Sequence, residues 1–113
     1  MKVINTKNAT HYRWGTNSDG WHLLHSDELS IIEERVPPGE AEQRHYHKRS
    51  QQFFYILSGL AHIEIDAEIF CLHQGCGIHV SPGCTHKLEN KSSQELRFLV
   101  VSQPHSHSDR VEV

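Results

Sequence analysis

The feature that most constrains this chain is the way glycine and proline cut it into short segments with strand-like patterns. Residues 61–65 alternate apolar and polar side chains with a period of two, as on a half-buried strand. Pro37-Pro38-Gly39 ends one such segment, and Pro82-Gly83 makes a tight turn before another. No stretch of a dozen residues has the 3.6-residue periodicity of a helix. The sequence therefore predicts an all-β sandwich or barrel.

Segments rich in apolar or β-branched residues mark the strands of this fold. Residues 53–57 are apolar throughout, so we expect that strand to be buried on both faces. Asp66-Ala67-Glu68 separates two strand-like segments and is expected to form a hairpin turn. The first ten residues could add an edge strand. The other expected strands are 21–24, 29–36, 41–47, 53–57, 61–65, 69–72, 78–80, 86–89 and 95–102.

The length of the chain indicates how many domains it forms. At 113 residues it is long enough for one domain with a substantial core, and neither a linker nor an internal repeat divides it. We therefore expect a single domain over residues 1–113. Residues 103–113 are polar and are predicted to form a flexible tail.

Charge and hydropathy exclude several classes of partner. The formal net charge is −3 with neutral histidines and there is no basic run, so neither nucleic acid nor an anionic membrane is an expected partner. No window is apolar enough to span a bilayer, and residues 1–14 lack the hydrophobic stretch of a signal peptide. Cys71, Cys76 and Cys84 form no Cys-x-x-Cys pair, which indicates reduced thiols and a cytoplasmic protein.

Histidine is unusually frequent in this chain, with 11 residues, and its spacing indicates a metal site. His45 and His47 are two positions apart, so on a strand both imidazoles point to the same face. His86, brought in by a later strand, could complete a site with three nitrogen ligands. Imidazole is accepted as a ligand by most divalent transition metals. We therefore predict that these three histidines bind one metal ion.

Residues 39–90 carry two motifs that resemble those of the cupins, a superfamily of small β-barrels. The first cupin motif has a glycine, five residues, His-x-His, three or four residues, a glutamate, six residues and a glycine. At that spacing this chain has Gly39, His45, His47, Gln52 and Gly59. It departs from the motif at one position, where Gln52 stands in place of the glutamate.

The second cupin motif has a glycine, five residues, Pro-x-Gly, two residues, a histidine, three residues and an asparagine. The matching residues here are Gly75, Gly83, His86 and Asn90. Ser81 replaces the proline of this motif, but Pro82 still restrains the turn. Every spacing of the two motifs is kept, so the chain is identified as a small, single-domain, type-2-like cupin.

The resemblance implies a double-stranded β-helix of the jelly-roll type that often forms homodimers. It also implies one divalent transition-metal ion inside the barrel, held by the motif residues His45, His47, Gln52 and His86. Iron, manganese, nickel, zinc and copper are all compatible with such ligands. In one interpretation Gln52 binds the ion directly. In the other, Gln52 lies behind the ligands without touching the ion, or the fourth coordination position is empty.

Gln52 changes the chemistry that the site can perform. Because its amide is neutral where glutamate is anionic, the loaded site would carry about two positive charges and have a lower intrinsic metal affinity. Gln52 also cannot act as a general base. Lewis-acid and oxygen-activating chemistry remain open.

These features predict a metal-binding cupin domain. If it is an enzyme, we expect metal-dependent turnover of a small oxygenated or enolisable compound, in a dioxygenase-like reaction. The alternative is a non-catalytic domain that binds or senses a small molecule. A weaker alternative is a sugar-phosphate isomerase-like cupin, because the run Gln43-x-His45-x-His47 resembles the ligands of mannose-6-phosphate isomerases. The chain lacks the nearby glutamate of that family and is far shorter.

Three further residues have two interpretations each. His62 and Glu64 share one face of a strand and form either an inward proton-transfer pair or part of a solvated outer face. Cys84, two residues before His86, is either an oxidisable thiol close to the metal or an ordinary turn residue.

Overall fold

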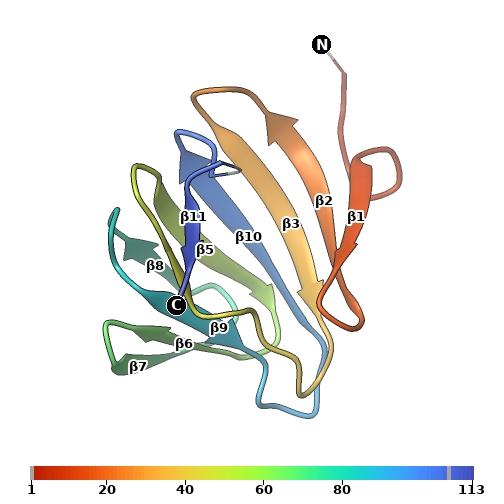
Figure 1. Ribbon diagram of the computed structural model, residues 1–113. Helices are drawn as coiled ribbons and strands as arrows, with labels where there is room; N and C mark the ends of the chain where they lie inside the picture. Colours follow the sequence, from red (N-terminus) through yellow and green to blue (C-terminus); the bar gives the residue numbers. More distant parts are fainter. Residues whose placement is uncertain (1, 107) are drawn as a thin grey trace.

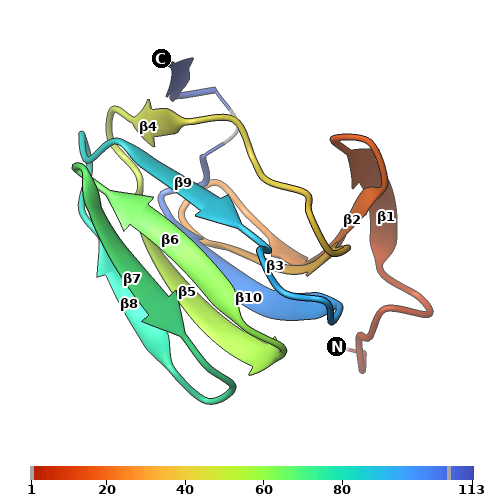
Figure 2. The same ribbon diagram turned by 90° about the horizontal axis from the view of Figure 1, so that it is seen from below.

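Two antiparallel β-sheets face each other in the computed structural model, which describes residues 2–106 and 108–113 (Figures 1 and 2). The six-stranded sheet has the order β1 (Thr10–Trp14), β2 (Ser18–His25), β3 (Ser30–Val36), β10 (Leu96–Gln103), β5 (Gln51–Ser58) and β8 (Gly77–Val80). The five-stranded sheet has the order β11 (Arg110–Glu112), β4 (His45–His47), β9 (His86–Glu89), β6 (Ala61–Ile65) and β7 (Glu68–Leu72).

This architecture is the double-stranded β-helix predicted from the sequence, and the described residues contain no helix. It follows that none of them forms a helix able to cross a membrane. The three cysteines are free thiols, as predicted from their odd number and the absence of a Cys-x-x-Cys pair.

The hydrophobic core lies between the two sheets and is built from alternate residues of each strand. In β10, Leu96, Phe98 and Val100 point inward and are at most 4% exposed. Ile63 of β6 and Leu88 of β9 meet them from the opposite sheet and are fully buried. Full burial of such a side chain stabilises the fold by about 1.5–3 kcal/mol. The period-two pattern therefore fixes which face of each strand looks into the barrel.

The outer face of β5 corrects one expectation. This strand was predicted to be buried on both faces, but Phe53 and Tyr55 are 42% and 41% exposed, while Phe54 and Ile56 between them are buried. An apolar run does not distinguish a strand covered on both faces from one whose apolar residues also face solvent. The partners opposite Phe53 and Tyr55 on β10 are Val101 and Leu99, so the exposed aromatic side chains extend an apolar patch across the sheet.

The C-terminal segment corrects a second expectation. Residues 103–113 were predicted to be a flexible tail, but Arg110–Glu112 forms β11, which is labelled in Figure 1. This strand pairs antiparallel with β4. Asp109 precedes this strand and is only 6% exposed. The segment is polar but not free in solvent, because β11 pairs with β4 and Asp109 bonds to His47.

Candidate metal centre

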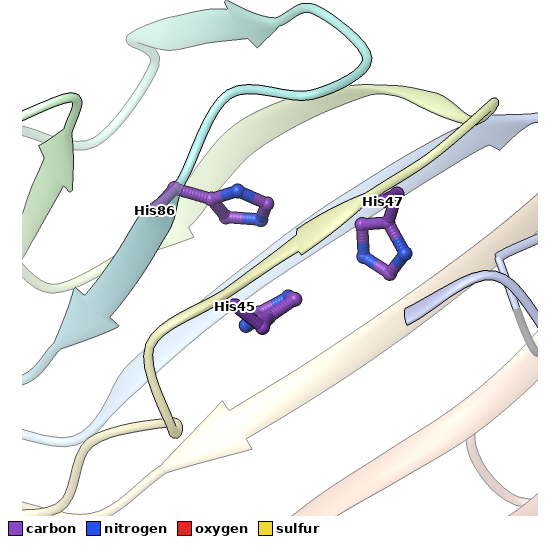
Figure 3. Close-up of side chains that lie close together, drawn as sticks. All are labelled: His45, His47 and His86. Carbon is purple, nitrogen blue, oxygen red and sulfur yellow. The ribbon is translucent and has the colours of Figure 1, made fainter. Parts of the chain in front are cut away.

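The antiparallel pairing of β4 and β9 brings the three candidate histidines together. His45 lies directly opposite His86 in the register, and His47 is two positions further along β4 on the same face. All three are at most 4% exposed, and one ring nitrogen of each lies within 4.8 Å of those of the others. The imidazoles turn toward one another from two strands that are distant in sequence (Figure 3). The structure thus brings together the histidines that spacing alone singled out.

The turn that precedes β9, at Pro82-Gly83, is hydrogen-bonded to β4. Gly83 follows Pro82 with a φ of +82°, which glycine adopts without steric cost. Its N–H donates to the carbonyl oxygen of His47 at 2.8 Å. This hydrogen bond connects the turn of the second cupin motif, three residues before His86, to the strand of the first motif.

Hydrogen bonds fix which nitrogen each imidazole can offer to a ligand. The Nδ1–H groups of His45 and His86 donate to backbone carbonyls two residues earlier, Gln43 O at 2.7 Å and Cys84 O at 2.9 Å. His47 Nδ1–H donates to Asp109 Oδ1 at 3.0 Å. With the proton held on Nδ1, Nε2 of each neutral ring keeps its lone pair. Three Nε2 atoms are thus left to bind a cation.

Gln52 reaches the cluster from the opposite sheet. It is 6% exposed, and its Oε1 lies 3.1 Å from Nε2 of His86, while its Nε2 donates to Ser102 Oγ at 3.0 Å. Because His86 carries its proton on Nδ1, this contact places two lone pairs face to face, and a shared cation would satisfy both. With the amide rotated by 180°, Gln52 would donate to His86 and accept from Ser102. The same side chain thus suits a metal-loaded and a metal-free site.

Burial keeps the three imidazoles neutral. Removal from water lowers the pKa of His45 to about 3 and also lowers the pKa values of His47 and His86. The Asp109 carboxylate opposes this effect at His47. Metal ligation requires deprotonated imidazole, so these shifts prepare the site for a cation. Three nitrogens and one amide oxygen form a donor set that fits a divalent transition metal.

Asp109 is a site residue that the sequence did not reveal. Besides accepting from His47, its carboxylate accepts from the backbone N–H groups of Arg49 and Ser50 at 2.9 and 2.8 Å. These bonds fix the carboxylate, which in turn fixes the tautomer and orientation of His47. The alternation of valine with polar residues at positions 110–113 was the one local sign that a strand follows Asp109.

His45 and His47 line a cavity of about 360 Å³ between the sheets, together with Gln52. Four residues that the sequence did not single out also line this cavity, two from the facing sheet and two from the side of the histidines: Tyr12 and Glu34, and Glu42 and Arg110. Burial raises the pKa of Glu34 to about 8 and that of Glu42 to about 7, while the Arg110 guanidinium opposes both shifts. The cavity therefore combines potential metal ligands with carboxyl groups that can hold a proton near neutral pH.

The remaining candidates lie outside this cavity or act through the backbone. His62 and Glu64 face outward, because Ala61 and Ile63, which alternate with them along β6, point into the core. Glu64 forms an ion pair with Arg44 Nη2 at 2.7 Å. The outer-face interpretation of this pair is thus the one that the structure shows. Cys84 contributes its carbonyl oxygen to His86, and burial raises the pKa of its thiol.

Comparison with known proteins bears on the family and the fold of the chain. A family model described as "Cupin domain" matches residues 32–102. The uncharacterized protein MJ1618 of Methanocaldococcus jannaschii is 36% identical over 81 residues, which cover 71% of this chain and 65% of that protein. The polyketide synthase protein CurC of Streptomyces cyaneus is 30% identical over 67 residues, covering 59% of this chain and 44% of CurC.

A solved structure extends the similarity to almost the whole fold. The polyketide cyclase RemF from Streptomyces resistomycificus superposes with a TM-score of 0.84 at 20% identity, covering 100% of this chain and 85% of RemF. At that identity the likeness concerns the fold. The chain spans about two thirds of MJ1618 and less than half of CurC.

The lowered pKa of His45 makes the stability of the metal-free protein depend on pH. Unfolded histidine binds a proton near pH 6.5, whereas folded His45 does so only near pH 3, so stability is lost as pH falls below 6.5. His45→Asn removes this contribution. The difference in unfolding free energy between wild type and His45→Asn should therefore change by about 2 kcal/mol between pH 7 and pH 5.

Chemical denaturation at the two pH values measures this difference. His73→Asn is the matched control, because His73 is exposed in the turn after β7 and its replacement should leave the pH dependence of the wild type unchanged. A wild type and a His45→Asn variant that lose stability in parallel would contradict the prediction.

Proposed function

Since the chain belongs to the cupin family and its three motif histidines converge, we propose that it binds one divalent transition-metal ion and acts on a small enolisable compound. His45, His47 and His86 would hold the ion through Nε2, with Gln52 Oε1 as a fourth ligand. The observation that carries the proposal is the convergence of three neutral, buried imidazoles whose Nδ1 atoms are already engaged.

The donor set determines the chemistry that such a site would favour. A bound divalent ion would supply Lewis-acid polarisation of a carbonyl oxygen next to an acidic C–H bond. Because all four donors are neutral, the positive charge of the ion would stay uncompensated by its ligands and favour an enolate or another anionic oxygen ligand. Asp109 would hold His47 in its binding orientation through the 3.0 Å hydrogen bond.

The relatives support an enolisable ligand. CurC and RemF are named as proteins of polyketide synthesis and cyclisation. Polyketide intermediates carry ketone groups separated by a single carbon, whose hydrogens are acidic. The cavity of about 360 Å³ lies at the small end of the range for small-molecule pockets, which favours a compact ligand.

Two alternatives are separated by simple measurements. A dioxygenase-like reaction would consume oxygen in the presence of diketones, catechols or thiols, whereas enolisation would not. A non-catalytic binding domain would be stabilised thermally by such a compound without converting it.

Metal binding is the first test. Wild-type protein stripped with a chelator and resupplied with Zn²⁺ should retain close to one ion per chain after dialysis, measured by elemental analysis. His86→Ala should lose this stoichiometric binding, because it removes one of three nitrogen ligands. His62→Ala, on the outer face of β6, should bind as the wild type does. A wild type that retains no ion would refute the proposed function.

Replacement of Gln52 by glutamate tests the fourth position. Gln52→Glu places a negative charge beside the ion inside the barrel, so the affinity for Zn²⁺ should rise by at least about tenfold in competition titrations with a chelator. Gln51→Glu adds the same charge on the exposed face of β5 and serves as the control. Equal affinities of the two variants would show that Gln52 lies away from the metal.

We also propose that the chain forms a homodimer through the outer face of the six-stranded sheet. Phe53 and Val101 are opposite each other on β5 and β10, as are Tyr55 and Leu99. The two aromatic side chains of this apolar patch are exposed in the single chain, and Val101 and Leu99 are half-buried. Patches of this kind are typical of protein interfaces. A second copy of the same sheet would cover the patch with a matching apolar surface.

Sedimentation velocity tests the dimer. Phe53→Lys should shift the wild-type dimer to monomer, because it places a charge in the centre of the patch. Ile69→Lys, at a position 58% exposed on the other sheet, should leave the dimer intact. A wild type that sediments as a monomer at micromolar concentration would contradict the proposal.

A further inference from the structure

The wall of the cavity opposite the histidines carries an ordered carboxyl group. Tyr12, Gly20 and Glu34 lie directly opposite one another on β1, β2 and β3. The Tyr12 hydroxyl donates a hydrogen bond to the Glu34 carboxyl group, across the strand between them. Glu34 alternates with Ile32 and Val36, whose side chains are buried, so it points into the barrel.

Gly20 makes this contact across β2 possible. A Cβ atom at position 20 would lie 2.2 Å from Cζ of Tyr12 and 2.4 Å from its hydroxyl oxygen. The tyrosine ring therefore lies over the glycine, in the space that any other residue would fill. Sequence alone gave no reason to connect these three positions, but together they hold a carboxyl group in a defined orientation.

Charged and titratable groups from several elements surround Glu34. Glu42, which accepts from the backbone N–H of Leu88 at 3.0 Å, and Arg110 of β11 act on it electrostatically. Tyr12 of β1 contacts it, and His22 of β2 and the two β4 histidines line the same cavity. Burial and the Glu42 carboxylate raise the pKa of Glu34, whereas Arg110 and the hydrogen bond from Tyr12 lower it. The resulting pKa of Glu34 is about 8. A group with such a pKa both releases and takes up a proton near neutral pH.

We propose that Glu34 is the proton-transfer residue for the carbonyl compound that the cavity binds, and that Tyr12 is its positioning residue. This inference rests on the proposed function. The glutamine at position 52 leaves the metal centre without a carboxylate base, and Glu34 supplies one from the facing sheet in the same cavity.

The step is a simple enolisation. The ionised Glu34 carboxylate forms an O–H bond with the hydrogen on the carbon next to the carbonyl group. The C–H bond breaks, and its electron pair forms a carbon–carbon double bond while the carbonyl π electrons move to oxygen. The products are an enolate and a protonated Glu34, so no oxidant or further reactant is needed. Return of a proton from Glu34 to the same carbon exchanges hydrogen with solvent.

Hydrogen exchange into hydroxyacetone, a small α-hydroxy ketone, provides the activity test. In D₂O, Zn²⁺-loaded wild type should replace the C–H hydrogens of this probe faster than free Zn²⁺ does, as followed by proton NMR. Glu34→Gln should lower the enzymatic rate by about 100-fold or more, the usual contribution of a general base. Glu33→Gln is the matched control, because Glu33 is on the outer face of β3 and accepts from Arg97 Nη1 at 3.1 Å. It should exchange as the wild type does.

The two proposals fail in different ways. A wild type that takes up no Zn²⁺ would overturn the proposed function. A Zn²⁺-loaded wild type that exchanges no faster than Glu34→Gln, when both bind one ion, would overturn the role of Glu34.

A titration of the metal-free protein tests Glu34 without any reaction. With ¹³C-labelled glutamate, the carboxyl signal that is absent from Glu34→Gln should titrate with a midpoint above pH 6.5. Tyr12→Phe should raise this midpoint further, because it removes a donor that stabilises the ionised form. A wild-type midpoint near 4.5, or a midpoint that Tyr12→Phe does not move, would overturn the proposal.

Discussion

The candidate site depends on the antiparallel pairing of two very short strands. His45 and His86 are opposite each other in that pairing, and the alternation of side chains along β4 adds His47 on the same face. A shift of one residue would turn both β4 histidines away from the cavity. The hydrogen bond from Gly83 to His47 and the pairing of β4 with β11 secure this register from two sides.

The two sheets contribute different chemistry to one cavity. The five-stranded sheet carries the imidazoles and orients them through carbonyl oxygens and Asp109. The six-stranded sheet carries Gln52 and the carboxyl group of Glu34 on strands that also supply much of the apolar core. Burial of these polar groups is tolerated because their donors have acceptors: each imidazole Nδ1–H bonds to a carbonyl or carboxylate oxygen, and the Gln52 amide donates to Ser102. The same apolar surroundings shift imidazole and carboxyl pKa values in opposite directions, so both remain neutral near pH 7.

The fold and the three histidines could be predicted from sequence because both depend on local patterns. Period-two alternation and glycine spacing describe strands and turns, and the motif spacing places His45, His47 and His86. Asp109 and the Tyr12–Gly20–Glu34 row could not be found in this way, because they arise from pairing between strands that no short motif encodes. The burial of β5 was misjudged for a related reason. An apolar run gives the composition of a strand but does not show whether another part of the protein covers its outer face.

The bond between His47 and Asp109 also has a consequence for biosynthesis. It joins residues 62 positions apart, so the imidazole cannot be fixed in its final orientation while the ribosome still holds the C-terminal strand. The nascent chain can form the hairpin of β6 and β7 much earlier, since its two strands adjoin in sequence. Metal uptake at full affinity would then have to wait until Asp109 and β11 have left the ribosome and docked against β4.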